Sequence, residues 1–425
     1  MTSRPFRPPF PHAAQNPKRA SGFSVVELMV VVAISLIMSV AIFGVLKAFE
    51  GRKRSTTSVN DVNQAGSYAL YQLDKLIRSA GSGYSANAAS TYGCRLNASV
   101  GGTQILPAAT LASPFDKVPA IVNVPTAGSF RLAPVIIVPS AGYSGVGNSG
   151  SDVLIVMSGS AGYGEVNSYF KKAAAAPNVN LLNTLGFSSN DLILLADQPA
   201  STASTTNIEP CYIEQIGGTP TADQLPLSGS YYHASGTDKY TSGNAASINA
   251  ISSSGMAFNI GNLTAGTLNL PNFQLVGLDA TNTLYSYDLL NAVSATPQAI
   301  ADGIYDMRAV YGISASSTLG SAITWVAPTG AYAPAALLAG TVAANAALQK
   351  IRAIRIGLVL RTSAPENTQV TTSPLTMFSD LTAGNPAPSY SKTLSASYPS
   401  TYPSERNYRY RIIESSIPIR NTLLN

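Results

Sequence analysis

Hydrophobic and polar positions follow three different patterns along the chain, and the first is a long apolar run at residues 23–46. Five residues in it are not apolar: Ser24, Glu27, Ser35, Ser39 and Gly44. As a helix, this run would span ~36 Å at ~1.5 Å per residue, which exceeds the roughly 30 Å core of a bilayer. The run therefore predicts a helix that can cross a membrane.

The segment before the apolar run, residues 1–22, is basic and rich in proline, which predicts an extended leader rather than a folded element. The chain has 26 basic and 21 acidic residues, and four of the basic residues lie in this leader. Without the leader, the net charge falls from +5 to +1 (22 against 21), so the charge gives no argument for nucleic acid. No small-residue cleavage site follows the apolar run, where the residues are Lys47, Ala48, Phe49 and Glu50. We therefore expect the helix to be retained.

The second pattern is amphipathic and helical, and it covers residues 49–82. Apolar or small residues recur at steps of four and three, and Leu70 and Ile77 widen this stripe. The stripe consists of Val62, Gly66, Ala69, Leu73, Leu76 and Ala80. Gly81 and Gly83 are expected to end this helix. We predict one continuous helix from about residue 23 to residue 80, with its second half packed on a head.

From residue 83 to residue 425 the apolar period changes to two, which predicts a head that is mostly β. In the run 351–362, Ile354, Ile356 and Leu358 share one face while Arg355 and Arg361 share the other, as in a sheet covered on one side by the helix stripe. Long surface loops are expected at 140–151, 199–207 and 228–256, which are dominated by small and polar residues. The strand candidates are 135–138, 152–157, 191–196, 284–288, 307–313, 351–362 and 408–413.

Glu27 is unusual because a carboxylate near hydrocarbon normally has a partner. One interpretation is local: Ser24 and Glu27 have the S-x-x-E spacing of a capping box, in which glutamine would serve equally well. The other is intermolecular. If the chain is cut after Gly22, Phe23 gains an ammonium group, and a carboxylate one helical turn later can pair with the ammonium of a neighbouring copy.

The basic leader, the Gly22-Phe23 junction, Glu27 and the long apolar run together resemble the signal of type IV pilins and pseudopilins. The resemblance implies cleavage between Gly22 and Phe23 by a prepilin peptidase on the cytoplasmic side, N-methylation of Phe23, and a subunit-docking role for Glu27. It also implies an α+β, pilin-like fold, in which the long helix packs on an antiparallel sheet within an enlarged, loop-rich head. Many pilins carry a proline in the apolar half of the helix, and this chain has none there.

Four C-terminal segments narrow the resemblance to large minor pilins of the PilW type. Such proteins sit with other minor pilins in a complex that primes pilus assembly, which implies a structural subunit near the pilus tip. The implied location is the inner membrane, with one span and a periplasmic head, and then the pilus at the cell surface. The implied partners are the prepilin peptidase, minor and major pilins, inner-membrane lipid before assembly and, as a further candidate, a tip adhesin. The four segments are TLYSYDL (283–289), IADGIYDMRAVYGI (300–313), IRAIRIGLVLRT (351–362) and RYRIIESSIPIRN (409–421).

Cys94 and Cys211 are the two cysteines of the chain, and both follow the membrane segment. On this topology they lie in an oxidising compartment, which favours a disulfide over two unrelated buried thiols. Closing so long a loop would stabilise the fold by about 4 to 5 kcal/mol on a chain-entropy model.

Candidate catalytic chemistry is sparse, and we expect neither an enzyme nor a cofactor. His233 is the one histidine after the leader and is expected in a solvated loop; with two cysteines it supplies too few ligands for a metal. Gly145, Gly147 and Gly150 spell G-x-G-x-x-G, but a predicted strand follows where the nucleotide-binding fingerprint needs a helix. Asp302 and Asp306 could bind a cation, although turn and surface roles are commoner for such pairs.

The alternation of Tyr408, Arg409, Tyr410 and Arg411 could suit nucleic acid, since cations hold phosphate and aromatic rings stack on bases. An amphipathic strand explains the same alternation and is the favoured interpretation, so a nucleic-acid partner is not expected. Two rival functions remain open. A pseudopilin of a type II secretion system would share the N-terminal signal, whereas a membrane-anchored periplasmic adhesin or enzyme would use the helix only as an anchor.

Overall fold

The computed structural model divides the chain into two units, residues 1–57 and residues 58–425. Helix α1 (Val25–Ser79) begins in the first unit and ends in the second. The structure describes residues 22–106, 111–118, 130–143, 150–160, 167–197, 210–233, 248–264, 269–290, 296–315, 321–381, 388–395 and 403–422.

Helix α1 confirms the predicted continuous helix, and both of its ends have local causes. At the start, the Ser24 hydroxyl accepts a hydrogen bond from the Glu27 backbone N–H (3.2 Å), which satisfies one of the unpaired donors of the first turn. At the other end, Gly81 has a φ of +80°, a conformation that glycine adopts without strain. The Asn421 amide donates to the carbonyls of Ser79 and Ala80 (both 3.1 Å), so the C-terminal segment caps the last turn.

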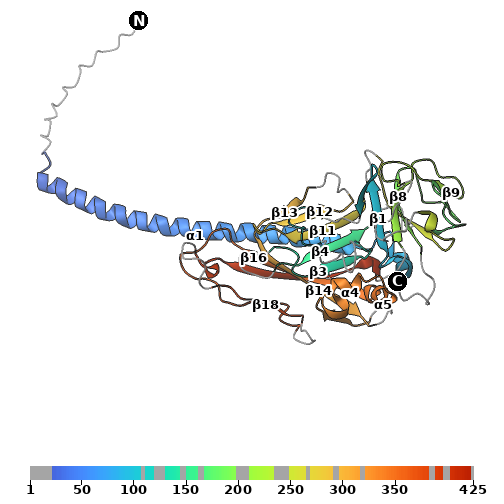
Figure 1. Cartoon of the computed structure of the whole chain (residues 1–425). Coiled ribbons are helices and arrows are strands. Elements are labelled where there is room, and N and C mark those ends of the chain that lie inside the picture. Colours follow the sequence, from blue (N-terminus) through green and yellow to red (C-terminus); the bar gives the residue numbers. More distant parts are fainter. Residues whose placement is uncertain are drawn as a thin grey trace, which may run out of the picture. The chain divides into compact units, whose positions relative to one another are not determined.

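The head contains three main sheets, which Figure 1 shows together with the second half of α1. The first has the order β2-β1-β8-β7-β10-β5 and is built from β1 (Arg95–Val100), β2 (Thr103–Leu106), β5 (Asn167–Tyr169), β7 (Asp191–Ala196), β8 (Pro210–Gln215) and β10 (Met256–Asn262). The second has the order β13-β12-β11-β4-β3 and is built from β3 (Val135–Val138), β4 (Val153–Ser158), β11 (Asn272–Leu278), β12 (Leu284–Asp288) and β13 (Gln298–Ala301). The third has the order β15-β14-β16-β19 and is built from β14 (Ile304–Ser314), β15 (Ile323–Val326), β16 (Ile351–Arg361) and β19 (Tyr410–Pro418).

Smaller elements complete the head. Two strand pairs are formed by β6 (Asn178–Asn180) with β9 (Gln224–Pro226) and by β17 (Leu375–Met377) with β18 (Tyr390–Lys392). The Thr341 hydroxyl caps the helix Val342–Gln349, the longest of the short helices, by accepting a hydrogen bond from Ala344 N–H (3.2 Å). The short helices are η1 (Ser85–Asn87), α2 (Ala88–Thr91), η2 (Ile248–Ala250), η3 (Gly330–Tyr332), α4 (Pro334–Leu337), α5 (Val342–Gln349), η4 (Glu405–Asn407) and η5 (Arg420–Thr422).

The predicted helix stripe lies in the main core. Ala69, Leu73, Ile77 and Ala80 are each at most 1% exposed. Gly66 also belongs to this face, where a Cβ atom would overlap the side chain of Leu360 on β16. The second half of α1 thus lies between the four-stranded sheet and the five-stranded sheet, as Figure 1 shows.

The expectation that the β16 sheet is covered on one side only is wrong. Val359 points away from α1 and is fully buried in a second cluster with Tyr305, Val310, Met377, Phe378 and Leu394. The segment that carries β17 and β18 therefore covers the face that Arg355 and Arg361 had suggested was exposed. The β7 strand is covered on both faces too, because Leu192 and Leu194 join the main core while Ile193 and Leu195 join a separate cluster with Phe170, Leu181 and Tyr212.

All seven strand candidates correspond to strands, three of them with the predicted bounds: β3, β7 and β12. One sheet departs from the antiparallel expectation, since β1 and β8 pair in parallel. The predicted loop 199–207 and residues Gly145 and Gly147 lie outside the described residues. Gly150 is followed by strand β4, as predicted, and not by a helix.

Candidate functional site

The N-terminal segment places its predicted functional residues on an exposed helix start. Phe23 is 80% exposed, and no heavy atom lies within 4 Å of the position that a Cβ atom of Gly22 would take. The serine half of the capping box is formed, by the hydrogen bond from Glu27 N–H to Ser24. The Glu27 carboxylate, in contrast, makes no hydrogen bond or ion pair with any residue in the described part of the chain. Its charge is therefore available to a group that these residues do not supply.

The first half of α1 exposes apolar side chains over its whole circumference. Every large hydrophobic residue from Val25 to Leu46 is at least 50% exposed. By length and composition, α1 is the one helix in the described residues that could cross a membrane. No residue that the structure describes in the first unit (22–57) covers this surface, which suits contact with lipid or with another protein.

Cys94 and Cys211 form the predicted disulfide, with their Cα atoms 5.6 Å apart. Cys94 directly precedes β1 and Cys211 lies in β8, so the bond joins the two parallel strands where they begin. It closes a loop with a sequence separation of 117 residues.

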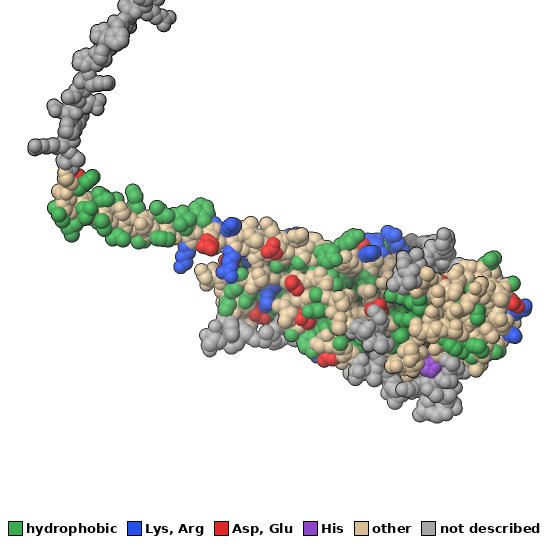
Figure 2. Space-filling view, turned by 90° about the horizontal axis from the view of Figure 1, so that it is seen from above, with side chains coloured by type: hydrophobic (Ala, Val, Ile, Leu, Met, Phe, Trp, Pro, Cys, Tyr) green, Lys and Arg blue, Asp and Glu red, His purple; other side chains and the backbone are tan. Residues whose placement is uncertain are grey.

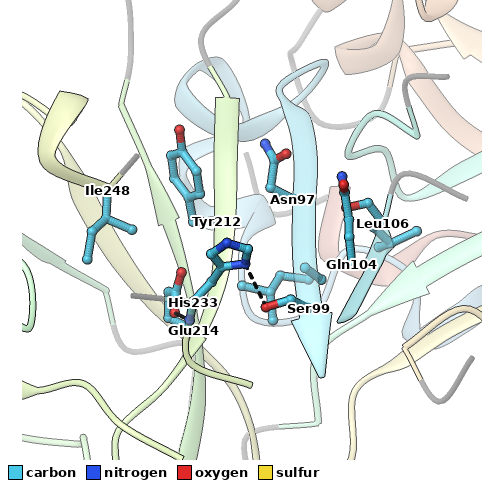
Figure 3. Close-up of a pocket in the computed structure, with 10 residues that line it drawn as sticks. Asn97, Ser99, Gln104, Leu106, Tyr212, Glu214, His233 and Ile248 are labelled. Carbon is cyan, nitrogen blue, oxygen red and sulfur yellow. Dashed lines mark hydrogen bonds between the residues drawn. The ribbon is translucent and has the colours of Figure 1, made fainter. Parts of the chain in front are cut away.

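A small cavity lies on the surface of the β2-β1-β8 region, and Figure 3 shows the side chains that line it. The strand register places Gln104 opposite Ser99 on β2 and β1, with Glu214 on the adjacent β8. His233 lies over this row: its Nδ1 is 3.0 Å from Ser99 Oγ, and its backbone N–H donates to Glu214 Oε2 (3.0 Å). The cavity volume is about 20 Å³, which is enough for roughly one water molecule.

Glu214 is 1% exposed, and burial raises its pKa to about 8. The hydrogen bond from His233 N–H opposes this rise, because it stabilises the charged form. The carboxyl group is therefore mainly neutral at pH 7. A neutral buried acid is a poor cation ligand and a poor base at that pH.

The Ser99, His233 and Glu214 side chains do not form a catalytic triad. A triad requires a carboxylate that accepts the second ring N–H of the histidine and orients the ring. Glu214 instead accepts the backbone N–H of His233, so it does not orient the ring. The group ties the segment before residue 234 to β1 and β8. His233 lies in a loop, as expected, but it is half-buried against the sheet rather than fully solvated.

A second polar group, at the junction of three sheets, consists of Asp152 on β4, Asp306 and Arg308 on β14, and Lys392 on β18. Arg308 lies 3.1 Å from Asp152 and 3.2 Å from Asp306, and Lys392 lies 3.9 Å from Asp306. Burial raises the pKa of Asp152 to about 6, and the charge of Arg308 opposes this rise. The four charges balance, so the cluster connects the sheets as buried ion pairs.

Asp302 and Asp306 are not a cation-binding pair. Asp302 accepts a hydrogen bond from the Thr283 hydroxyl (2.9 Å) at a turn, as expected, whereas Asp306 is fully buried and belongs to the ion-pair cluster. The surface role expected for Asp306 is therefore wrong. Among the described residues, no group of three or more histidine, cysteine, aspartate or glutamate side chains could hold a metal ion.

The tyrosine and arginine alternation before and within β19 is that of an amphipathic strand. The ring of Tyr410 packs against that of Tyr305 with centroids 5.2 Å apart, on the face of the second cluster. Arg411 is exposed, and Arg409 pairs with Glu366 at 2.9 Å. Packing thus accounts for the tyrosines, and solvent and an ion pair account for the arginines.

A larger groove, of about 420 Å³, separates the second half of α1 from β11, β12 and β13. Its lining alternates apolar residues such as Leu76 and Ile300 with amides such as Gln72 and Gln274. Lys75 is the one charged residue lining it in the described part of the head, so the groove lacks a paired acid and base.

Two family models match the chain at opposite ends. The model described as a prokaryotic N-terminal methylation motif matches residues 17–43, and the model described as type IV pilus-assembly protein W (PilW) matches residues 258–421. The two matches support a type IV pilus minor pilin of the PilW type. Comparison of this pilin with curated proteins and with solved structures found no significant match.

The PilW match runs from within β10 to within η5, and it includes all four segments that carried the resemblance in the sequence. The pilin thus combines a methylation-motif helix with a matched C-terminal part that supplies the four-stranded sheet and most of the five-stranded one. The cavity lined by Ser99, Glu214 and His233 lies outside both matches. Sequence reasoning missed it because Ser99 and Glu214 meet only through the parallel pairing of strands far apart in the chain. The available signal was an acid inside the apolar run Cys211-Tyr212-Ile213-Glu214.

Proposed function

We propose that this pilin is made as a precursor, cut between Gly22 and Phe23 by a prepilin peptidase, methylated at Phe23, and inserted into a type IV pilus through the first half of α1. One observation carries the proposal: the exposed apolar helix holds a single carboxylate, on Glu27, that no described residue engages, one turn after Phe23. A free ammonium on Phe23 of a neighbouring subunit supplies the matching charge.

The driving force for assembly is the exchange of lipid neighbours for protein neighbours. Because lipid tails are as apolar as leucine, helices associate in a bilayer through close packing and polar contacts rather than through hydrophobic burial. Ser35, Ser39, Ala41 and Gly44 allow such close approach. Ser39 already satisfies its own hydroxyl by donating to the Ser35 carbonyl (2.7 Å), so it brings no unpaired donor into the contact.

In this proposal residues 1–22 are the leader, residues 23–48 span the inner membrane and later form the filament core, residues 49–82 continue the helix, and residues 83–425 form the head. The head lies in the periplasm and then on the pilus. The Cys94–Cys211 disulfide suits that compartment because disulfides persist in oxidising surroundings. The partners are other minor and major pilins in an assembly-priming complex at the tip, where a tip adhesin is a further candidate partner.

The experiment compares Glu27→Gln with Glu50→Gln, a matched removal of an exposed acid farther along the same helix. Glu27→Gln should abolish or strongly reduce piliation while the protein still fractionates with the membrane, and Glu50→Gln should leave both unchanged. Normal piliation with Glu27→Gln would refute the docking role and favour a capping role, which glutamine also fills. Loss of type II secretion without loss of pili would identify a pseudopilin instead. Mass spectrometry of the mature N-terminus reports cleavage and methylation together.

A further inference from the structure

A cluster of cations follows the apolar run directly, and neither the docking proposal nor the head uses it. Lys47, Arg52, Lys53 and Arg54 lie within eight residues of each other, with Glu50 as the one acid among them. All five side chains are exposed. None forms an ion pair with any residue that the structure describes. We call these four basic residues the girdle.

The girdle surrounds the helix instead of forming a stripe along it. At about 100° per residue, Arg52, Lys53 and Arg54 lie at about 140°, 240° and 340° around the helix axis from Lys47. Figure 2 agrees, because blue side chains project on both sides of the helix just beyond its green part. A single protein groove would contact one face only. A layer that encloses the helix contacts all four cations.

The height of the girdle along the helix matches the headgroup layer of a bilayer. With residues 23–46 in the hydrocarbon, Lys47 lies about 1.5 Å and Arg54 about 12 Å beyond the apolar run. The headgroup region on each side is roughly 5 to 8 Å thick, and long basic side chains reach several ångströms along it. All four cationic groups can therefore reach lipid phosphates in the leaflet opposite the leader.

We propose that Lys47, Arg52, Lys53 and Arg54 bind anionic phospholipid headgroups in that leaflet and hold the subunit in the membrane before assembly. The proposal rests on the proposed function in one respect, namely that residues 23–48 lie in a bilayer. The net charge of the girdle with Glu50 is +3 (four minus one), which favours anionic over zwitterionic lipid. Entry into a filament has to release these lipids, so the girdle opposes premature extraction.

The test measures partition of the full-length protein from non-ionic detergent micelles into vesicles, by flotation. One set of vesicles is phosphatidylcholine alone, and the other is phosphatidylcholine with an equal part of phosphatidylglycerol. The preference for the anionic vesicles should fall about 100-fold in the variant Arg52→Gln, Lys53→Gln, Arg54→Gln, since each cation near an anionic surface contributes about 1 kcal/mol. Added salt should reduce the preference of the native protein toward that of the variant.

The matched control removes three exposed cations from the head, Lys172→Gln, Lys350→Gln and Arg420→Gln. This control should keep the native preference for anionic vesicles. Because it loses the same number of positive charges as the girdle variant, it distinguishes the position of the cations from the net charge of the protein. Equal preference in the native protein and the girdle variant, or an equal loss in the control, would overturn the proposal and would leave neighbouring subunits as the partners of these cations. Failure of all variants to enter either vesicle would instead overturn the membrane function itself. Glutamine keeps the helix, which circular dichroism should verify.

Discussion

The two halves of α1 have the same backbone structure and opposite surroundings. Large apolar residues from Val25 to Leu46 are at least 50% exposed, whereas Ala69, Leu73, Ile77 and Ala80 are at most 1% exposed. The second half has a partner within the chain, because the sheets that contain β16 and β4 cover its apolar stripe. The first half has its apolar residues on all sides, so no single sheet could cover it. The surroundings of a helix thus follow from the width of its apolar surface: a stripe can be covered by one head, whereas a full apolar circumference requires lipid or several neighbouring helices.

Removal of the disulfide should have the largest effect on the stability of the head and none on the first half of α1. Replacing Cys94 and Cys211 together by serine should lower the free energy of unfolding of the head by about 4 to 5 kcal/mol, because the disulfide closes a long loop in the unfolded chain. Membrane insertion of α1 should not change. The stability of the head is measured by denaturant unfolding, followed by the fluorescence of Trp325, the single tryptophan. Membrane insertion is measured by flotation with vesicles. Loss of insertion in the serine variant would show that the two units depend on each other.

The second prediction compares a buried acid, Glu214, with an exposed one, Glu27. The pKa of Glu214 is raised on folding, so its neutral form stabilises the head fully below about pH 4.5, and this stabilisation is lost as the pH rises toward 8. Glu214→Gln stays neutral and can still accept the His233 N–H. The variant should therefore exceed the native head in stability at pH 9, by on the order of 4 kcal/mol, and match it at pH 4. Glu27→Gln should change head stability at neither pH. Unfolding midpoints across that pH range measure both, and a Glu214→Gln head with the native pH profile would contradict the assignment.

Two leucines then test the contrast in burial directly. Leu73→Ala should lower head stability by about 3 kcal/mol, since it removes a buried side chain and leaves a cavity. Leu36→Ala, at a position that is 63% exposed, should leave head stability unchanged. Parallel denaturant titrations in the same detergent measure the difference. If both variants unfold at the same denaturant midpoint as the native protein, the apolar stripe does not stabilise the head to the extent that its burial indicates.

The smallest effect concerns two glycines of the same helix. A Cβ at Gly66 would overlap Leu360, so Gly66→Ala should destabilise the head by about 1 kcal/mol or more through overpacking. Apart from the helix's own backbone, no described heavy atom lies within 4 Å of the corresponding position at Gly44, so Gly44→Ala should favour the helix by up to about 1 kcal/mol. Helix content by circular dichroism and head unfolding distinguish the two changes. Reduced piliation with Gly44→Ala would show in addition that close helix packing needs this glycine.

The sequence predicted those elements in which one pattern dominates. The apolar run and the stripe gave α1 to within two residues at either end, and alternation located β3, β7 and β12. Strands such as β1 (RLNASV) and β8 (PCYIEQ) were missed, because polar residues on them face a cavity or a neighbouring segment rather than solvent. The second covering of β16 was missed for a similar reason. The sequence pattern assigns Arg355 to solvent, yet its guanidinium pairs with Asp380 and Glu414 at 2.7 Å over a sheet that is buried on this face.

Candidate site residues were predictable to the extent that they are local. Gly22, Phe23, Ser24 and Glu27 are neighbours in the chain, so their spacing alone indicates a helix start with a carboxylate one turn later. The cysteine pairing followed from there being two cysteines on one side of a membrane segment. The cavity at Glu214 and the buried cluster at Asp306 depend on strand register across the sheets, which no local pattern encodes.

The disulfide between Cys94 and Cys211 also determines how the head bears mechanical load. A pulling force that enters through α1 and leaves through the C-terminal part of the chain passes along the covalent backbone. At Cys94 the sulfur bridge offers a direct route to Cys211, so the residues between them carry no tension along their backbone. Strands β1 to β7 are thus shielded from a force applied between α1 and the C-terminal part of the chain.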